Sequence, residues 1–90
     1  MNANYIDIDT VKNFLHEHYS KGEAVQLEFV KRDGTLRKMT IQEDQKLLAT
    51  IRGERKVSNE TNRVVCEKLE DGSTQFRSIP LDRVLTLATL

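Results

Sequence analysis

Basic side chains gather on both sides of the turn predicted at Asp33-Gly34. Two bases precede the turn and two follow it, against one acid in the same segment: Lys31, Arg32, Arg37 and Lys38. Lysine and arginine bind phosphate oxygens through charge-assisted hydrogen bonds, and clusters of them are typical of nucleic-acid-binding surfaces. This spacing predicts anion binding, with RNA or single-stranded DNA as the ligand.

A second basic segment lies further along the chain, over residues 52–63. It holds four bases against two acids, and the bases are Arg52, Arg55, Lys56 and Arg63. Residues 1–30 hold five acids and two bases, so a chain with 14 bases and 14 acids is expected to be bipolar, with one acidic and one basic end. The alternative interpretation is that these bases only solvate the surface and keep edge strands from pairing with other chains.

Catalytic and metal-binding patterns are absent from the sequence. His16 and His18 are two residues apart on a predicted helix, about 200° around its axis, and cannot hold one ion together. Cys66 alternates with apolar residues in a predicted strand and is expected to be buried. No serine lies in a nucleophile motif, and the four glycines form no phosphate-binding loop. We therefore expect a non-enzymatic protein with no cofactor and no metal.

Aromatic side chains could support base stacking only if they are exposed. Phe14 and Phe29 lie at positions that the periodicity assigns to the core. Tyr5, Tyr19 and Phe76 remain as candidate stacking platforms.

The elements that must position the basic residues begin with a helix over about residues 9–21. Asp9 is the expected N-cap and Gly22 the expected stop. The apolar stripe follows the spacing i, i+3, i+4 and i+7, at Val11, Phe14, Leu15 and His18. This helix is expected to cover an open end of a sheet.

Beyond Gly22 the apolar period changes to two, which predicts strands. Asp-Gly turns predict two hairpins, one joining 24–30 to 35–41 and the other joining 63–69 to 74–79. Imperfect phase in 35–41 predicts a bulge or a strong bend there. Pro80 ends a strand, and a last strand covers 83–87. Residues 42–62 are expected to form a long loop or a short helix.

One helix and five short, bent strands predict a mainly β, α+β fold of the SH3-like or Sm-like small-barrel type. Ninety residues make a single domain, residues 1–90, with the barrel over about 24–88.

Two segments, Phe29–Met39 and Leu69–Val84, resemble a family of small phage-encoded Sm-like SH3-barrel proteins distantly related to WYL domains. The resemblance implies a phage or prophage origin, an accessory role in the cytoplasm of an infected host cell, and nucleic acid or host proteins as partners. Gln75-Phe76 stands where the family often has a tryptophan, so a WYL-type ligand pocket is not implied.

The second functional hypothesis is a protein-binding module or inhibitor that acts on a host or phage protein. The C-terminal segment Val84–Leu90 is apolar for a chain end, which suggests self-association through the last strand. A single cysteine, no leader segment and no apolar run near a membrane span in length predict an intracellular protein without a membrane partner.

Overall fold

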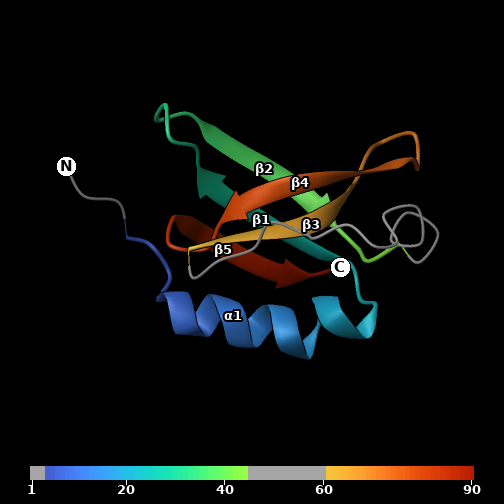
Figure 1. Ribbon diagram of the computed structural model, residues 1–90, viewed down its shortest axis with the longest axis horizontal. Coiled ribbons are helices and arrows are strands. Elements are labelled where there is room, and N and C mark those ends of the chain that lie inside the picture. The colour runs from blue at the N-terminus through green and yellow to red at the C-terminus, as the bar shows by residue number, and fades with distance from the viewer. Residues whose placement is uncertain (1–3, 45–60) are drawn as a thin grey trace, which may run out of the picture.

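The computed structural model describes residues 4–44 and 61–90. These residues form one α-helix, a single 3-10 turn and five antiparallel strands in one open sheet (Figure 1). The elements in chain order are α1 (Ile8–Glu17), η1 (Tyr19–Lys21), β1 (Val25–Val30), β2 (Leu36–Ile41), β3 (Asn62–Lys68), β4 (Thr74–Pro80) and β5 (Val84–Thr89). The predicted mainly β architecture with an N-terminal helix is confirmed. The loop or helix expected over 42–62 falls mostly outside the described residues.

The N-cap of helix α1 lies two residues earlier than the sequence predicted. Asp7, in an extended conformation, is the N-cap, and its carboxylate accepts hydrogen bonds from the backbone N–H groups of Asp9 (3.1 Å) and Thr10 (3.4 Å). The assignment of Asp9 as the cap was therefore wrong, and Asp9 instead adds negative charge to the first turn. The α-helix ends at Glu17, earlier than the predicted end at residue 21, with His18 as its C-cap. The predicted stop at Gly22 instead ends the 3-10 turn η1, and Gly22 has a left-handed backbone with φ of 92°.

Both Asp-Gly pairs form the same kind of hairpin turn. In the first, Lys31 and Thr35 bond through their backbones (2.8 Å) and Gly34 takes φ of 91°. The Asp33 carboxylate accepts from the backbone N–H (3.0 Å) and the hydroxyl (2.7 Å) of Thr35. Leu69 to Ser73 repeat this arrangement with Asp71 as the acceptor. Both predicted hairpins are confirmed.

The strands are ordered β4-β3-β2-β1-β5, so β4 and β5 are the two edges. Only three residues, 81–83, connect these edge strands, and the backbone N–H of Leu81 bonds back to Thr61 (2.7 Å). A connection this short requires a strongly rolled sheet, although the sheet does not close. Of the bulge or strong bend predicted in β2, the bulge is wrong, because β2 pairs with β1 in unbroken register. The register shift lies between β1 and β5, where Leu85 is the extra residue.

The core lies between the inward face of the sheet and the helical segment. Cα partners across the sheet place β1 residues 25, 27 and 29 on the same face as 41, 39 and 37 of β2. Helical residues complete the core, which contains Val11, Leu15, Tyr19, Val25, Leu27, Phe29, Met39, Ile41, Val65, Ile79, Leu81 and Val84. Leu36 faces outward and is 59% exposed, which explains the imperfect apolar phase of β2.

Strands β2 and β3 pair at only two positions, Thr40 with Lys68 and Ile41 with Glu67. Just after β2, the backbone N–H of Gln42 donates to the carbonyl of Cys66 (3.0 Å), and beyond this bond β3 leaves the segment that contains β2. A side chain then takes the place of a neighbouring strand. The backbone N–H of Cys66 donates to the hydroxyl of Tyr19 (2.8 Å), and both residues are buried. The helical segment therefore satisfies a backbone group that β2 does not reach. Burial also raises the pKa of Tyr19, so its hydroxyl remains neutral.

We predict that Tyr19→Phe lowers the free energy of unfolding by about 1–3 kcal/mol, because the buried N–H of Cys66 loses its acceptor while the ring stays. Urea denaturation monitored by circular dichroism measures the change. Tyr5→Phe, at a side chain 40% exposed, is the control and should change stability little. Equal effects of the two substitutions would contradict this role of the hydroxyl.

Candidate functional site

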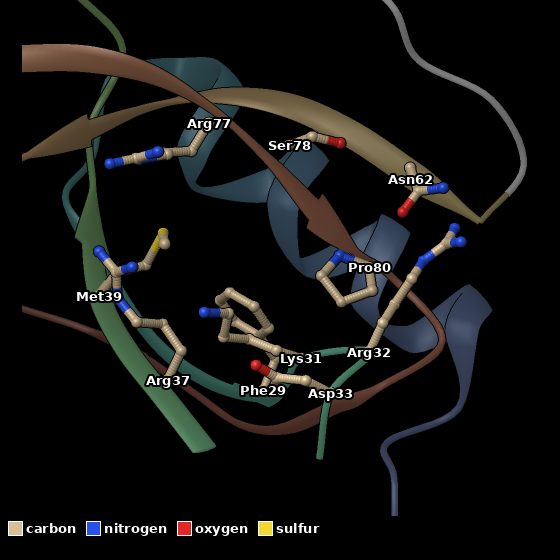
Figure 2. A pocket seen from close by; sticks show the side chains of 10 residues that line it. All are labelled: Phe29, Lys31, Arg32, Asp33, Arg37, Met39, Asn62, Arg77, Ser78 and Pro80. Atoms are coloured by element: carbon tan, nitrogen blue, oxygen red, sulfur yellow. The ribbon is translucent and has the colours of Figure 1, made fainter. Parts of the chain in front are cut away.

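A hollow of about 570 Å³ opens between the first hairpin and strand β4. Figure 2 shows Arg77, Arg37 and Met39 on one side and Arg32, Pro80 and Asn62 on the other. We call it the cationic hollow, and its lining residues are Phe29, Lys31, Arg32, Asp33, Arg37, Met39, Asn62, Arg77, Ser78 and Pro80. Four of these carry positive charge and one, Asp33, carries negative charge.

The first hairpin turn presents Lys31 and Arg32 at the mouth of the cationic hollow. Its shape is maintained by the Asp33 carboxylate, whose pKa is held below its usual value by hydrogen bonds from Thr35. The guanidinium of Arg83 also donates to the carbonyl of Lys31 (3.3 Å), which ties the turn to the start of β5. The two cations therefore project from a well-supported loop.

Arg37 points to the inward face because it alternates with Met39 and Ile41 along β2. A charged residue at such a position must find a partner. The partner is Glu67 of β3, whose side chain is only 6% exposed. Arg37 Nη2 lies 2.7 Å from Glu67 Oε2, so the ion pair spans the gap where β2 and β3 separate.

Among the described residues, three side chains donate hydrogen bonds to Glu67. Oε1 accepts from Arg77 Nε (3.2 Å) and Gln75 Nε2 (3.3 Å), both on β4. Burial by itself raises the pKa of the Glu67 carboxyl, but the hydrogen bonds from Gln75, Arg37 and Arg77 together hold it below its usual value. One ionised carboxylate thus positions two guanidinium groups beside the cationic hollow.

The structure brings together three of the predicted basic residues, Lys31, Arg32 and Arg37, around the cationic hollow. Lys38 lies opposite Glu28 of β1, and strand alternation places it on the outer face of the sheet. Arg63 also points elsewhere, since its guanidinium stacks 5.1 Å from the Tyr19 ring and donates to Ser20 Oγ (3.2 Å). The predicted site residues Arg52, Arg55 and Lys56 lie outside the described residues.

Two residues of the site, Arg77 and Glu67, were not predicted. Both carry a signal in the sequence, because Arg77 alternates with the buried Ile79 and Glu67 with the buried Val65. Charges of opposite sign at inward strand positions are a pattern that favours a buried ion pair. Which arginine meets the carboxylate depends on how the sheet rolls.

The predicted aromatic platforms are only partly available. Tyr19 is 3% exposed and belongs to the core, so its assignment as a stacking platform was wrong. Tyr5 is 40% exposed and Phe76 is half-buried, and neither lines the cationic hollow. The predicted burial of Phe29 is confirmed, and this ring lines the hollow together with Met39.

The cysteine and His18, which by residue type could serve in catalysis or metal binding, pack against other parts of the protein. Cys66 is buried, as predicted. His18 packs against the Phe14 ring at 4.5 Å and places Nδ1 3.2 Å from Glu23 Oε1. In residues 4–44 and 61–90, no three His, Cys, Asp or Glu side chains converge as metal ligands would. Within the same ranges, none of the helical structure has the length and apolar character that crossing a membrane requires.

No family model, no curated protein and no solved structure matches this chain.

We predict that Glu67→Gln lowers the free energy of unfolding near neutral pH by about 2 kcal/mol, because Arg37 and Arg77 lose their shared charge. A carboxyl whose pKa is lowered by folding contributes stability above its unfolded pKa and loses it as the pH falls through the folded value. The pKa of Asp33 and Asp71 is lowered as well, so the parent protein should lose stability below about pH 5.

Urea midpoints at about pH 7 and about pH 3 test this expectation. The difference between the two midpoints should be smaller in Glu67→Gln than in the parent protein. The matched control is Glu70→Gln in the exposed second turn, which should keep the parent's difference. An unchanged difference in Glu67→Gln would show that this carboxylate is not the group that titrates.

Proposed function

We propose that this protein is a non-enzymatic nucleic-acid-binding protein that takes RNA or single-stranded DNA into the cationic hollow. The observation that carries the proposal is the convergence of Lys31, Arg32, Arg37 and Arg77 on one concave surface. Phosphate groups supply most of the free energy of nucleic-acid binding, through charge neutralisation and counterion release.

The distribution of charge supports this proposal in a chain with no net charge. Residues 1–30, which include α1, hold five of the acids and only two bases, whereas residues 31–38 hold four bases and one acid. A phosphate backbone would be drawn to the second region and repelled by the first, so orientation would follow from electrostatics.

A single strand fits the cationic hollow better than a duplex does. The surface is concave, and the side chains of Phe29, Met39 and Pro80 contribute apolar area to its lining. Unpaired bases present flat faces that pack on such side chains, whereas a duplex keeps its bases stacked inside.

We also propose that the rolled sheet is an open form of the SH3-like or Sm-like small barrel, and that the protein is a phage accessory protein. The barrel proposal draws support from the three-residue connection between the edge strands and from the leading helix. The phage origin is supported by the resemblance of Phe29–Met39 and Leu69–Val84 alone.

We predict that Lys31→Ala combined with Arg32→Ala weakens binding to a fluorescent oligouridylate or oligothymidylate of about ten nucleotides. The slope of log K against log salt should become shallower by about 1.4, since each lost phosphate contact to a single strand removes about 0.7. Fluorescence anisotropy between about 50 and 200 mM salt measures both quantities.

The matched control is Lys12→Ala combined with Lys21→Ala, which removes the same charge from exposed positions on α1 and η1. It should leave the slope at the parent value. Equal slopes for the two double variants would show that Lys31 and Arg32 do not contact the phosphates. If the parent protein does not bind the oligonucleotide, the nucleic-acid proposal is wrong.

A second candidate function, protein binding or self-association, is favoured by the C-terminal part of the β5 edge. At the start of this edge the carbonyl of Val84 already accepts a hydrogen bond from the backbone N–H of Ile6 (2.7 Å). Leu90 donates its backbone N–H to Ala24 beside β1 (3.1 Å), so the N–H of Thr89, one residue earlier, points to the opposite side. An edge segment whose outward N–H has no backbone partner among residues 4–44 and 61–90 can add a strand from another chain.

We predict that the parent protein forms dimers or larger species at high concentration and that Thr89→Pro is monomeric, because proline removes the outward donor. Light scattering coupled to size exclusion measures the mass. Ala88→Ser, at the neighbouring exposed residue, should retain the parent's mass. A monomeric parent protein would eliminate β5 as an assembly edge.

A further inference from the structure

Arg37 and Arg77 reach the cationic hollow from two different strands, and both are held by the same buried carboxylate. Arg37 contacts Glu67 through Nη2 and Arg77 through Nε, at 2.7 and 3.2 Å. A guanidinium has five N–H donors in a rigid plane. The hydrogen bonds of these two groups within the described residues each use one nitrogen, so both planes keep further donors for a ligand.

The charge balance of this cluster also favours an anion. The single negative charge of Glu67 faces the two positive charges of Arg37 and Arg77. Gln75 donates a further hydrogen bond to the carboxylate without adding charge. The side chains of Arg37 and Arg77 are 35% and 48% exposed, whereas that of Glu67 is 6% exposed. The negative charge is therefore buried, and the excess positive charge faces solvent, beside Lys31 and Arg32.

The volume and the apolar lining of the cationic hollow favour a ligand larger than an inorganic anion. Its volume of about 570 Å³ lies in the range of small-molecule sites, about 300–1,000 Å³, and a phosphate group alone would leave most of it empty. Phe29 and Met39 are 4% and 5% exposed, so they present a thin apolar floor that is already packed. Pro80 continues this apolar surface along β4.

A ligand that suits both parts has an anionic group at one end and a flat, weakly polar ring at the other. We infer that the cationic hollow is a subsite for one nucleotide, with its phosphate between Arg37 and Arg77 and its base against Phe29, Met39 and Pro80. This inference rests on the proposed nucleic-acid function and deepens it, because it assigns a single nucleotide unit to one built site.

Glu67 is then a positioning residue of this subsite. Glu67 does not contact the ligand, because its carboxylate is buried and accepts hydrogen bonds from three donors. Its effect is to hold two planar groups in place before the ligand arrives, which reduces the entropy lost on binding.

The test uses the full chain, labelled with ¹⁵N and titrated with uridine 5′-monophosphate, uridine or inorganic phosphate. The monophosphate should shift the backbone amide signals of Phe29, Met39 and Arg77 and should displace a fluorescent oligouridylate. Uridine and phosphate should each bind at least about tenfold more weakly, because each engages only one part of the subsite.

The test variant is Arg77→Lys, which keeps the positive charge but removes the planar guanidinium group and its Nε hydrogen bond to Glu67. It should weaken binding of the monophosphate at least about tenfold while the spectrum retains the dispersion of a folded protein. Lys12→Ala should bind the monophosphate as the parent does.

The outcomes separate the two proposals. If the oligonucleotide binds but the monophosphate neither shifts these amides nor competes, the single-nucleotide subsite is wrong and the proposed function stands. Inorganic phosphate that binds as tightly as the monophosphate also overturns the subsite. If the monophosphate binds at these amides and no oligonucleotide binds, the nucleic-acid function fails and a free nucleotide is the ligand. If nothing binds, both proposals fail.

Discussion

The position of strands β3 and β4 relative to β2 depends on the hydrogen bonds and ion pairs of the buried Glu67 carboxylate. Strands β2 and β3 share only two paired positions, and just after β2 the backbone N–H of Gln42 donates to the carbonyl of Cys66 (3.0 Å), so few backbone hydrogen bonds hold the two strands together. Glu67 connects three strands through side chains, to Arg37 of β2 and to Arg77 and Gln75 of β4. A buried charge is costly unless its partners are all in place, and this requirement favours one relative position of the strands.

The same separation of strands accounts for the two features that distinguish this sheet. On the helical side, Tyr19 occupies the space that β2 leaves and accepts the hydrogen bond of Cys66. On the side of β4, the space between the separated strands is the cationic hollow. Core side chains such as Phe29 and Met39 form the apolar part of its lining. A fully paired sheet would satisfy its own backbone at both places and would leave no such hollow.

Local patterns in the sequence were sufficient to predict most of the elements. Both hairpins follow from Asp-Gly pairs, whose aspartates bond to Thr35 and Ser73 and whose glycines take positive φ. The N-cap was misplaced by two residues because Asp7 and Asp9 are the same residue type, so the capping preference does not distinguish them. A bulge or strong bend was predicted in β2 because its apolar phase is interrupted, but the interruption reflects an outward Leu36 and an inward Arg37 and no bulge is present in its pairing with β1.

The sequence by itself determined the types and order of the elements, the local turn geometry and the concentration of positive charge around Asp33-Gly34, because each depends on residues close together in the chain. Only the tertiary structure decided which charges meet. Lys38 and Arg37 are neighbours in sequence, yet strand alternation separates them onto opposite faces, whereas Arg77 joins Arg37 from 40 residues away. Contacts of this kind depend on the roll of the sheet and on the buried carboxylate that two distant arginines share.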